Sequence, residues 1–170
     1  MQVRRRAAAP LLLALALLGA WPRQLLAQGE GDEAARALFI EGSKLAKQGR
    51  WDEARSRYAA SLKLRPAPLT RYSLGVAQRE TGHLADALAS FRLFLAETQS
   101  TATLPYVPPA QAALAELRME VGRLALVVGP RPMEGLTLTL DGEAMEQAPL
   151  RDIDPGAHEI IARAPGFQEG

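Results

Sequence analysis

The stretches that decide the fold are GSKLAKQGRWDEARSRY (residues 42–58) and GVAQRETGHLADALASF (residues 75–91). They align at an offset of 33 residues, and the matching positions hold two glycines, an alanine and an aromatic residue: Gly42, Gly49, Ala54 and Tyr58 in the first, Gly75, Gly82, Ala87 and Phe91 in the second. An offset of this size is typical of stacked helical hairpins, in which each hairpin buries its apolar face against the next. The pattern favours a partner-binding scaffold over a catalytic pocket.

The residues around each stretch extend it into a complete hairpin. Apolar side chains at helical spacing, interrupted by Gly49, predict one hairpin over residues 32–64 with Asp32 as the N-cap of its first helix. The same spacing around Gly82 predicts a second hairpin over residues 68–97.

The two segments resemble tetratricopeptide repeats. In that family a small residue in each helix lets the hairpin close, and an aromatic residue follows four positions after the alanine of the second helix. The matching residues are Gly42, Ala54, Tyr58 and Pro66 in the first repeat and Leu74, Gly75, Ala87 and Phe91 in the second. The sequence departs from the family at Leu38 and Arg71, where a tryptophan is usual, and no proline closes the second repeat. The resemblance implies a repeat domain over residues 28–98.

Two repeats are fewer than the three usually needed for independent stability, so we expect a further element to cap the stack. A helix over residues 109–121 would do so. It follows a loop over residues 99–108 that is rich in Ser, Thr and Pro and ends at Pro108. Its expected apolar stripe consists of Ala112, Leu114, Leu117 and Val121.

After Gly122 the hydrophobic period changes from helical to alternating. Leucine and valine occupy every second position over residues 124–128 and 136–140, which predicts strands with one buried face. Asp141-Gly142 predicts a tight turn, and Asp154-Pro155-Gly156 predicts another before an extended run over residues 157–164. The expected fold class is therefore α+β, with helical hairpins first and a small antiparallel β module over residues 122–170.

This β half resembles the PEGA domain, a small β module of bacterial envelope proteins. The matching residues are Pro132, Glu134-Gly135, the LTLTL run at 136–140, Asp141-Gly142, Ala148-Pro149-Leu150, Asp154-Pro155-Gly156-Ala157-His158 and Pro165-Gly166-Phe167. Met133 interrupts the family's Pro-Glu-Gly-Ala run, and Leu136 replaces its alanine. The family's module continues with one or two more strands, which leaves two alternatives: the sequence is a fragment, or the sheet has lost its last strand. A missing strand would leave an open edge that can pair with another chain.

Residues 1–27 have the pattern of a secretory signal peptide. Three arginines at positions 4–6 precede an apolar run from Ala7 to Trp21, and we expect cleavage after Ala27. Cleavage after Ala20 and a retained anchor are the alternatives; the run is short for a membrane span. The sequence thus predicts a periplasmic or otherwise exported protein with no transmembrane span after cleavage.

Charge and cysteine content exclude further classes. Removal of residues 1–27 leaves 16 basic and 19 acidic side chains, a net charge of −3 with no basic cluster, which argues against a nucleic-acid partner. The chain has no cysteine, so disulfides and thiolate chemistry are excluded.

No constellation of residues predicts a catalytic, cofactor or metal site, and we expect a protein that is not an enzyme. His83 and His158 each lack a second ligand at metal spacing, which favours structural or solvent-exposed roles. Asp152 and Asp154 point the same way in an extended segment, but Asp154 precedes Pro-Gly and is most simply a turn former.

The tetratricopeptide resemblance also implies a peptide-binding groove, because the first helix of each repeat lines the concave face in that family. Carried over by position, its candidate residues are Arg36, Phe39, Ser43, Lys47, Tyr72, Val76 and Arg79. A groove that is both aromatic and basic suits an extended peptide with an acidic group. The alternative is that Phe39 and Tyr72 belong to the core and the charged side chains only solvate the helices.

The function that these features predict is an exported, non-enzymatic scaffold for protein–protein interaction in the bacterial cell envelope. The alternative is an envelope carbohydrate- or peptidoglycan-binding protein acting through the β module. A sugar site usually presents Trp or Tyr on a strand face, and residues 122–170 contain neither.

Overall fold

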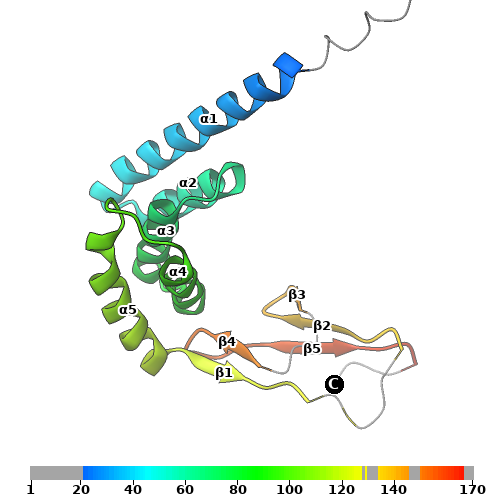
Figure 1. The fold of residues 1–170 in the computed structure, drawn as a ribbon. Helices are drawn as coiled ribbons and strands as arrows, with labels where there is room; N and C mark the ends of the chain where they lie inside the picture. The colour runs from blue at the N-terminus through cyan, green and yellow to red at the C-terminus, as the bar shows by residue number, and fades with distance from the viewer. Residues whose placement is uncertain (1–20, 128, 130–133, 146–149, 167–170) are drawn as a thin grey trace, which may run out of the picture.

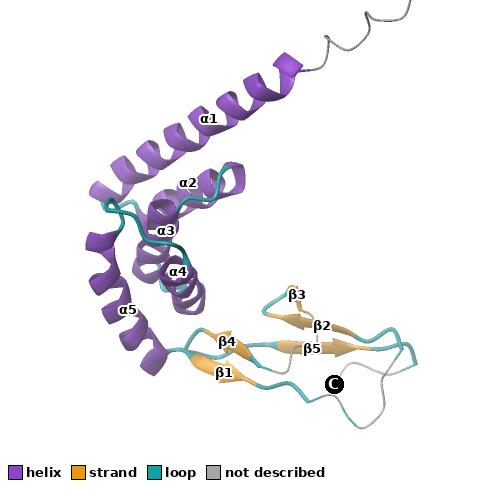
Figure 2. Cartoon of the chain, in the orientation of Figure 1, coloured by secondary structure: helices purple, strands orange, loops and turns teal. Residues whose placement is uncertain are grey.

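The computed structural model describes residues 21–127, 129, 134–145 and 150–166, with side chains from residue 31 onwards. In this part of the chain five α-helices come first and five short strands follow (Figures 1 and 2). The strands lie beyond the end of the last helix and are not interleaved with the helices (Figure 2). The predicted α+β class is therefore confirmed. None of the helices described here is long and apolar enough to cross a membrane.

Four helices form two antiparallel hairpins: α1 (Trp21–Lys47) with α2 (Trp51–Leu64), and α3 (Pro68–Glu80) with α4 (Leu84–Ala96). The ends of these helices agree with the two predicted hairpins, except at the start of α1. The helices stack in chain order, since α2 also packs on α3 (Figure 1).

The predicted start of the first helix at Asp32 is wrong, because α1 begins eleven residues earlier at Trp21 and runs past α2 (Figure 1). Proline is tolerated in the first turn of a helix, so Pro22 does not interrupt it, and Gln, Leu and Ala after it are helix formers. Asp32 therefore lies inside α1, where its carboxylate forms an ion pair with Arg65 at the end of α2.

The turns inside the two hairpins are built alike. Gly49 and Gly82 adopt the left-handed conformation, with φ of +74° and +78°. The amide of Arg50 donates to the carbonyl of Leu45, and the amide of His83 donates to the carbonyl of Gln78. This is the hydrogen bonding of a Schellman motif, repeated at the offset seen in the sequence.

Close packing of a glycine against an aromatic ring sets the distance between the helices of each hairpin. A Cβ atom on Gly42 would lie 2.9 Å from Cε1 of Tyr58, and one on Gly75 would lie 3.1 Å from Cε1 of Phe91. Ala54 and Ala87 are completely buried one turn before each ring. Larger residues at these positions would separate the helices.

Helix α5 (Val107–Glu120) covers the second hairpin, after a short 3₁₀ turn over Leu104–Tyr106. It begins two residues before the predicted capping helix, because Pro108 and Pro109 fit its first turn. Its buried face is Ala110, Ala113, Leu114 and Leu117. The prediction for Ala112 is wrong, since that residue is exposed. The buried face packs on Ala87, Leu88, Phe91 and Phe94 of α4 to form the larger core of the helical part.

The strands form two small antiparallel sheets. One pairs β1 (Gly122–Leu124) with β4 (Arg151–Ile153), and the other has the order β3 (Glu143–Met145), β2 (Thr137–Leu140), β5 (Ile160–Arg163). The predicted tight turn joins β2 to β3, with φ of 52° at Asp141 and 82° at Gly142. Leu138 and Leu140 are buried, as their alternation predicts.

The strands are shorter than the predicted runs. The first ends at Leu124, and Val128 lies outside the described residues. The last covers residues 160–163 instead of 157–164, because the Glu159 amide donates to the Asp141 side chain. β3 and β4 were not predicted, since three residues are too few to show a period.

Substitution of the buried alanine of α4 tests the repeat packing. We expect Ala87→Leu to lower the free energy of unfolding by about 1–3 kcal/mol, because the added volume has no space beside Phe91. Ala89→Leu on the exposed face of the same helix is the matched control and should change it by no more than about 0.5 kcal/mol. Urea denaturation followed by circular dichroism measures the free energy of unfolding of both variants. Equal losses in the two variants would contradict the packing described here.

Candidate functional site

A groove of about 750 Å³ lies between α1 and the start of α3, at the end of the stack opposite to α5. Its walls are mostly apolar. The lining residues are Asp32, Glu33, Ala35, Arg36, Ala37, Phe39, Ile40, Ser61, Arg65, Ala67, Leu69 and Thr70. Ile40 keeps 44% of its surface exposed, which is high for isoleucine and leaves an apolar face for a ligand.

Contacts with α2 hold the α1 residues of the groove floor in place. Buried Ser61 of α2 donates a hydrogen bond of 2.7 Å to the carbonyl oxygen of Ala35 in α1. The ring of Phe39 packs on Tyr58, with ring centroids 5.7 Å apart. The shape of the groove therefore depends on contacts between α1 and α2.

Charged side chains surround the apolar floor. Asp32 pairs with Arg65 across one end of the groove. Arg36 and Glu33 lie on the same helix, and no ion pair joins either of them to another side chain of the described residues. The groove thus offers one guanidinium and one carboxylate that remain available to a ligand.

The seven residues predicted to form a groove do not come together. Arg36 and Phe39 line the groove described here. Ser43 donates to the carbonyl of Phe39 and accepts a bond of 3.3 Å from the Tyr58 hydroxyl, so it is used inside the hairpin. Lys47 is exposed in the last turn of α1.

The candidates of the second repeat pack against the core formed by α4 and α5 or pair with α5. The Tyr72 ring contacts Phe91, Phe94 and Tyr106, and burial raises the pKa of its hydroxyl. Val76 packs on the same core. Arg79 pairs with Glu116 of α5 at 3.2 Å. Helix α5 therefore occupies the surface that α3 would offer to a peptide.

Of the lining residues only Arg36 and Phe39 were predicted, although the sequence held a signal for two of the others, Leu69 and Ile40. Leu69 lies 33 residues after Arg36, so the repeat offset applied to Arg36 identifies it. Ile40 follows Arg36 by one helical turn and shares its face. Arg65 had no such signal, because it enters the groove from the end of α2.

The remaining polar residues singled out in the sequence lie at the other end of the molecule, where β4 meets α4. Asp152 pairs with Arg92 of α4 at 2.5 Å, and Asp154 accepts a bond of 2.6 Å from the amide of Ala85. Both carboxylates thus point the same way, as the spacing predicts, and both reach α4. The His83 ring lies within hydrogen-bond distance of the hydroxyl and the carbonyl oxygen of Thr81, in its own turn.

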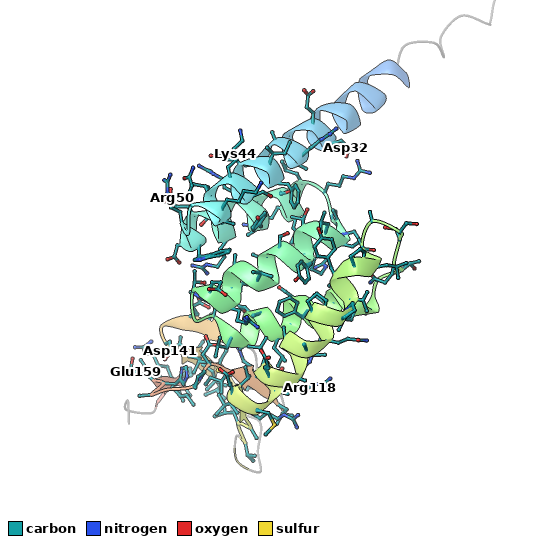
Figure 3. The ribbon with its side chains drawn as sticks, turned by 90° about the vertical axis from the view of Figure 1, so that its left-hand side faces the viewer. Asp32, Lys44, Arg50, Arg118, Asp141 and Glu159 are labelled. Carbon is teal, nitrogen blue, oxygen red and sulfur yellow. The ribbon has the colours of Figure 1, made fainter. Side chains whose placement is uncertain are left out.

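His158 sits between two acceptors. Its Nδ1 lies 2.6 Å from Asp141 Oδ2, and its Nε2 lies 2.7 Å from the carbonyl oxygen of Asp154. The hydrogen bond to the Asp141 carboxylate, followed by the one to the Asp154 carbonyl, raises the pKa of His158. The same bond lowers the pKa of Asp141, helped by the amide of Glu159. Figure 3 shows Asp141 and Glu159 together, far from Asp32 at the groove.

No protein-family model and no curated protein matches this chain. Within the described residues, no three His, Asp or Glu side chains gather in a way that could hold a metal ion. The groove is therefore the candidate site on geometric grounds.

Removal of the Ser61 hydroxyl tests how the groove floor is held. We expect Ser61→Ala to lower the free energy of unfolding by about 0.5–1.5 kcal/mol, because a buried hydrogen bond between two helices is lost. Ser56→Ala is the control, since its hydroxyl bonds only within α2 and is exposed. Thermal unfolding followed by circular dichroism compares them, and an equally small effect of both would contradict the role of Ser61.

Proposed function

We propose that the protein is an exported, non-enzymatic scaffold that holds a segment of a partner protein in the groove between α1 and α3. The observation that carries this proposal is the groove itself, an apolar surface with Ile40 exposed at the open end of a helical stack. Exposed apolar surface beside polar residues is a common mark of a binding site for another protein.

The charges around the groove indicate the chemistry of the segment. Arg36 lies one turn from Ile40 and can pair with a carboxylate of the ligand, while Glu33 would repel one. An apolar segment with an acidic residue near one end therefore fits best, with the apolar residues on Phe39 and Ile40 and the acidic residue on Arg36.

The resemblances support the same function. Helical hairpins of the tetratricopeptide type bind segments of other proteins, and we propose that α1 to α4 are two such repeats with α5 as their cap. We propose further that the β part is a PEGA-type module that docks to a second envelope component. That clause rests on analogy with the family alone.

Selection from a random peptide library displayed on phage tests the proposed groove. We expect enriched peptides to combine apolar and acidic residues. For such a peptide, Ile40→Glu should weaken binding by at least about tenfold, because the apolar contact is lost and a like charge is added. Arg36→Gln should weaken binding roughly fivefold through loss of the ion pair, whereas Glu33→Gln should strengthen it.

Fluorescence anisotropy with a labelled peptide measures these affinities. Lys63→Gln, on the exposed side of α2, is the matched control and should leave binding unchanged. If the peptide binds Ile40→Glu as tightly as the unsubstituted chain, the proposal is wrong. It is also wrong if Arg36→Gln strengthens binding and Glu33→Gln weakens it.

Expression of the full chain in a bacterium tests export separately. We expect the intact mass of the periplasmic form to correspond to a chain that begins at Gln28, because small Ala27 precedes it. A start at Trp21 would support export with the alternative cleavage site. A full-length chain retained in the cytoplasm would contradict export.

A further inference from the structure

The helical part and the β part meet where β4 lies beside α4. The bonds across this contact are polar, and both come from carboxylates two residues apart, Asp152 and Asp154. The apolar cluster under α5 includes no residue from the strands.

Asp154 caps the N-terminus of α4, although it is far from this helix in the sequence. Helix α4 has His83 at its N-cap, and no side-chain bond from His83 reaches the helix. The Asp154 carboxylate instead accepts the Ala85 amide from 69 residues away at 2.6 Å. An acidic group at a helix N-terminus satisfies an amide that has no intrahelical partner and interacts favourably with the helix dipole.

Asp152 forms the second bond of the contact, to Arg92 two turns along α4. Both side chains of this pair are partly exposed, so the pair is weakened by salt. Two polar bonds therefore hold the β part against α4, in addition to the direct chain connection from α5 to β1.

The ring of His158 bridges the turn at Asp141 and the loop that contains Asp154. Both of its ring nitrogens face oxygen atoms that only accept hydrogen bonds, namely a carboxylate oxygen of Asp141 and the backbone oxygen of Asp154. An imidazole can donate from both nitrogens only when it is protonated. The neutral ring must give up one of the two bonds.

We propose that protonated His158 ties the Asp141 turn to the Asp154 loop so that Asp154 caps α4, and that deprotonation of His158 loosens the β part from the helical stack. The groove lies on α1 and does not take part, so this device is independent of the proposed function.

The direction of the pH dependence follows from the charges around the ring. Asp141 and Asp154 face His158, and Arg151 is near Asp141. On α4, Arg92 pairs with Asp152, and the carboxylate of Asp86 lies in the first turn of the helix. The pKa of His158 is raised in the folded state. The stabilisation of the contact by His158 is therefore complete below the ordinary pKa of 6.5 and is lost as the pH rises through the raised pKa.

A distance measurement between the two parts tests this device in the full chain. The chain has no cysteine, so Gln111→Cys on α5 and Glu143→Cys on β3 add two exposed sites for spin labels. By double electron–electron resonance we expect a narrow distance distribution at about pH 5.5 that broadens by about pH 8.5, as the imidazole loses its proton. His158→Gln and Asp154→Ala should each give the broad distribution at both pH values.

His83→Gln is the matched control, because His83 is the other histidine of the chain and should leave the pH response intact. Circular dichroism confirms that each variant is folded. An unchanged distribution in the unsubstituted chain between the two pH values would overturn the proposal, whether or not the variants fold. So would a His158→Gln variant that responds to pH as the unsubstituted chain does.

Discussion

The structure depends above all on the contact of a glycine with an aromatic ring inside each helical hairpin. Gly42 meets Tyr58 and Gly75 meets Phe91 so closely that even a Cβ atom at the glycine would crowd the ring. The helices of each hairpin can therefore lie close together, and the alanines of the second helices become fully buried. Because interiors are densely packed, this spacing decides where every following helix can lie.

One consequence is that the two ends of the stack differ. Helix α5 packs on α4, and Tyr106 of the 3₁₀ turn before it contacts Tyr72 of α3, so the surface of the second hairpin is used internally. Within the described residues no element covers the first hairpin along α1 in this way, and Phe39 and Ile40 line the groove there. The proposed binding site is thus a part of the helical surface that the described residues leave open.

The β part is joined to this stack by a different kind of interaction. Helix packing buries apolar surface and is insensitive to pH, whereas the contact of Asp152 and Asp154 with α4 depends on charge and on hydrogen bonds. A polar contact with few bonds can be opened at small cost in free energy. The protein therefore combines a helical stack with an apolar core and a β part attached to α4 by polar bonds.

The amino-acid sequence by itself determined the hairpins, their glycine turns and the tight turn at Asp141-Gly142, because each depends on helical spacing or on positive φ over a few neighbouring residues. Only the tertiary structure decided that Tyr106 would pack on Tyr72, that Arg65 would enter the groove, and that Asp154 would cap α4. These contacts join residues far apart in the chain, where no local pattern records the pairing. The short strands β3 and β4 belong with them, since pairing with a partner strand defines such segments and their own composition does not.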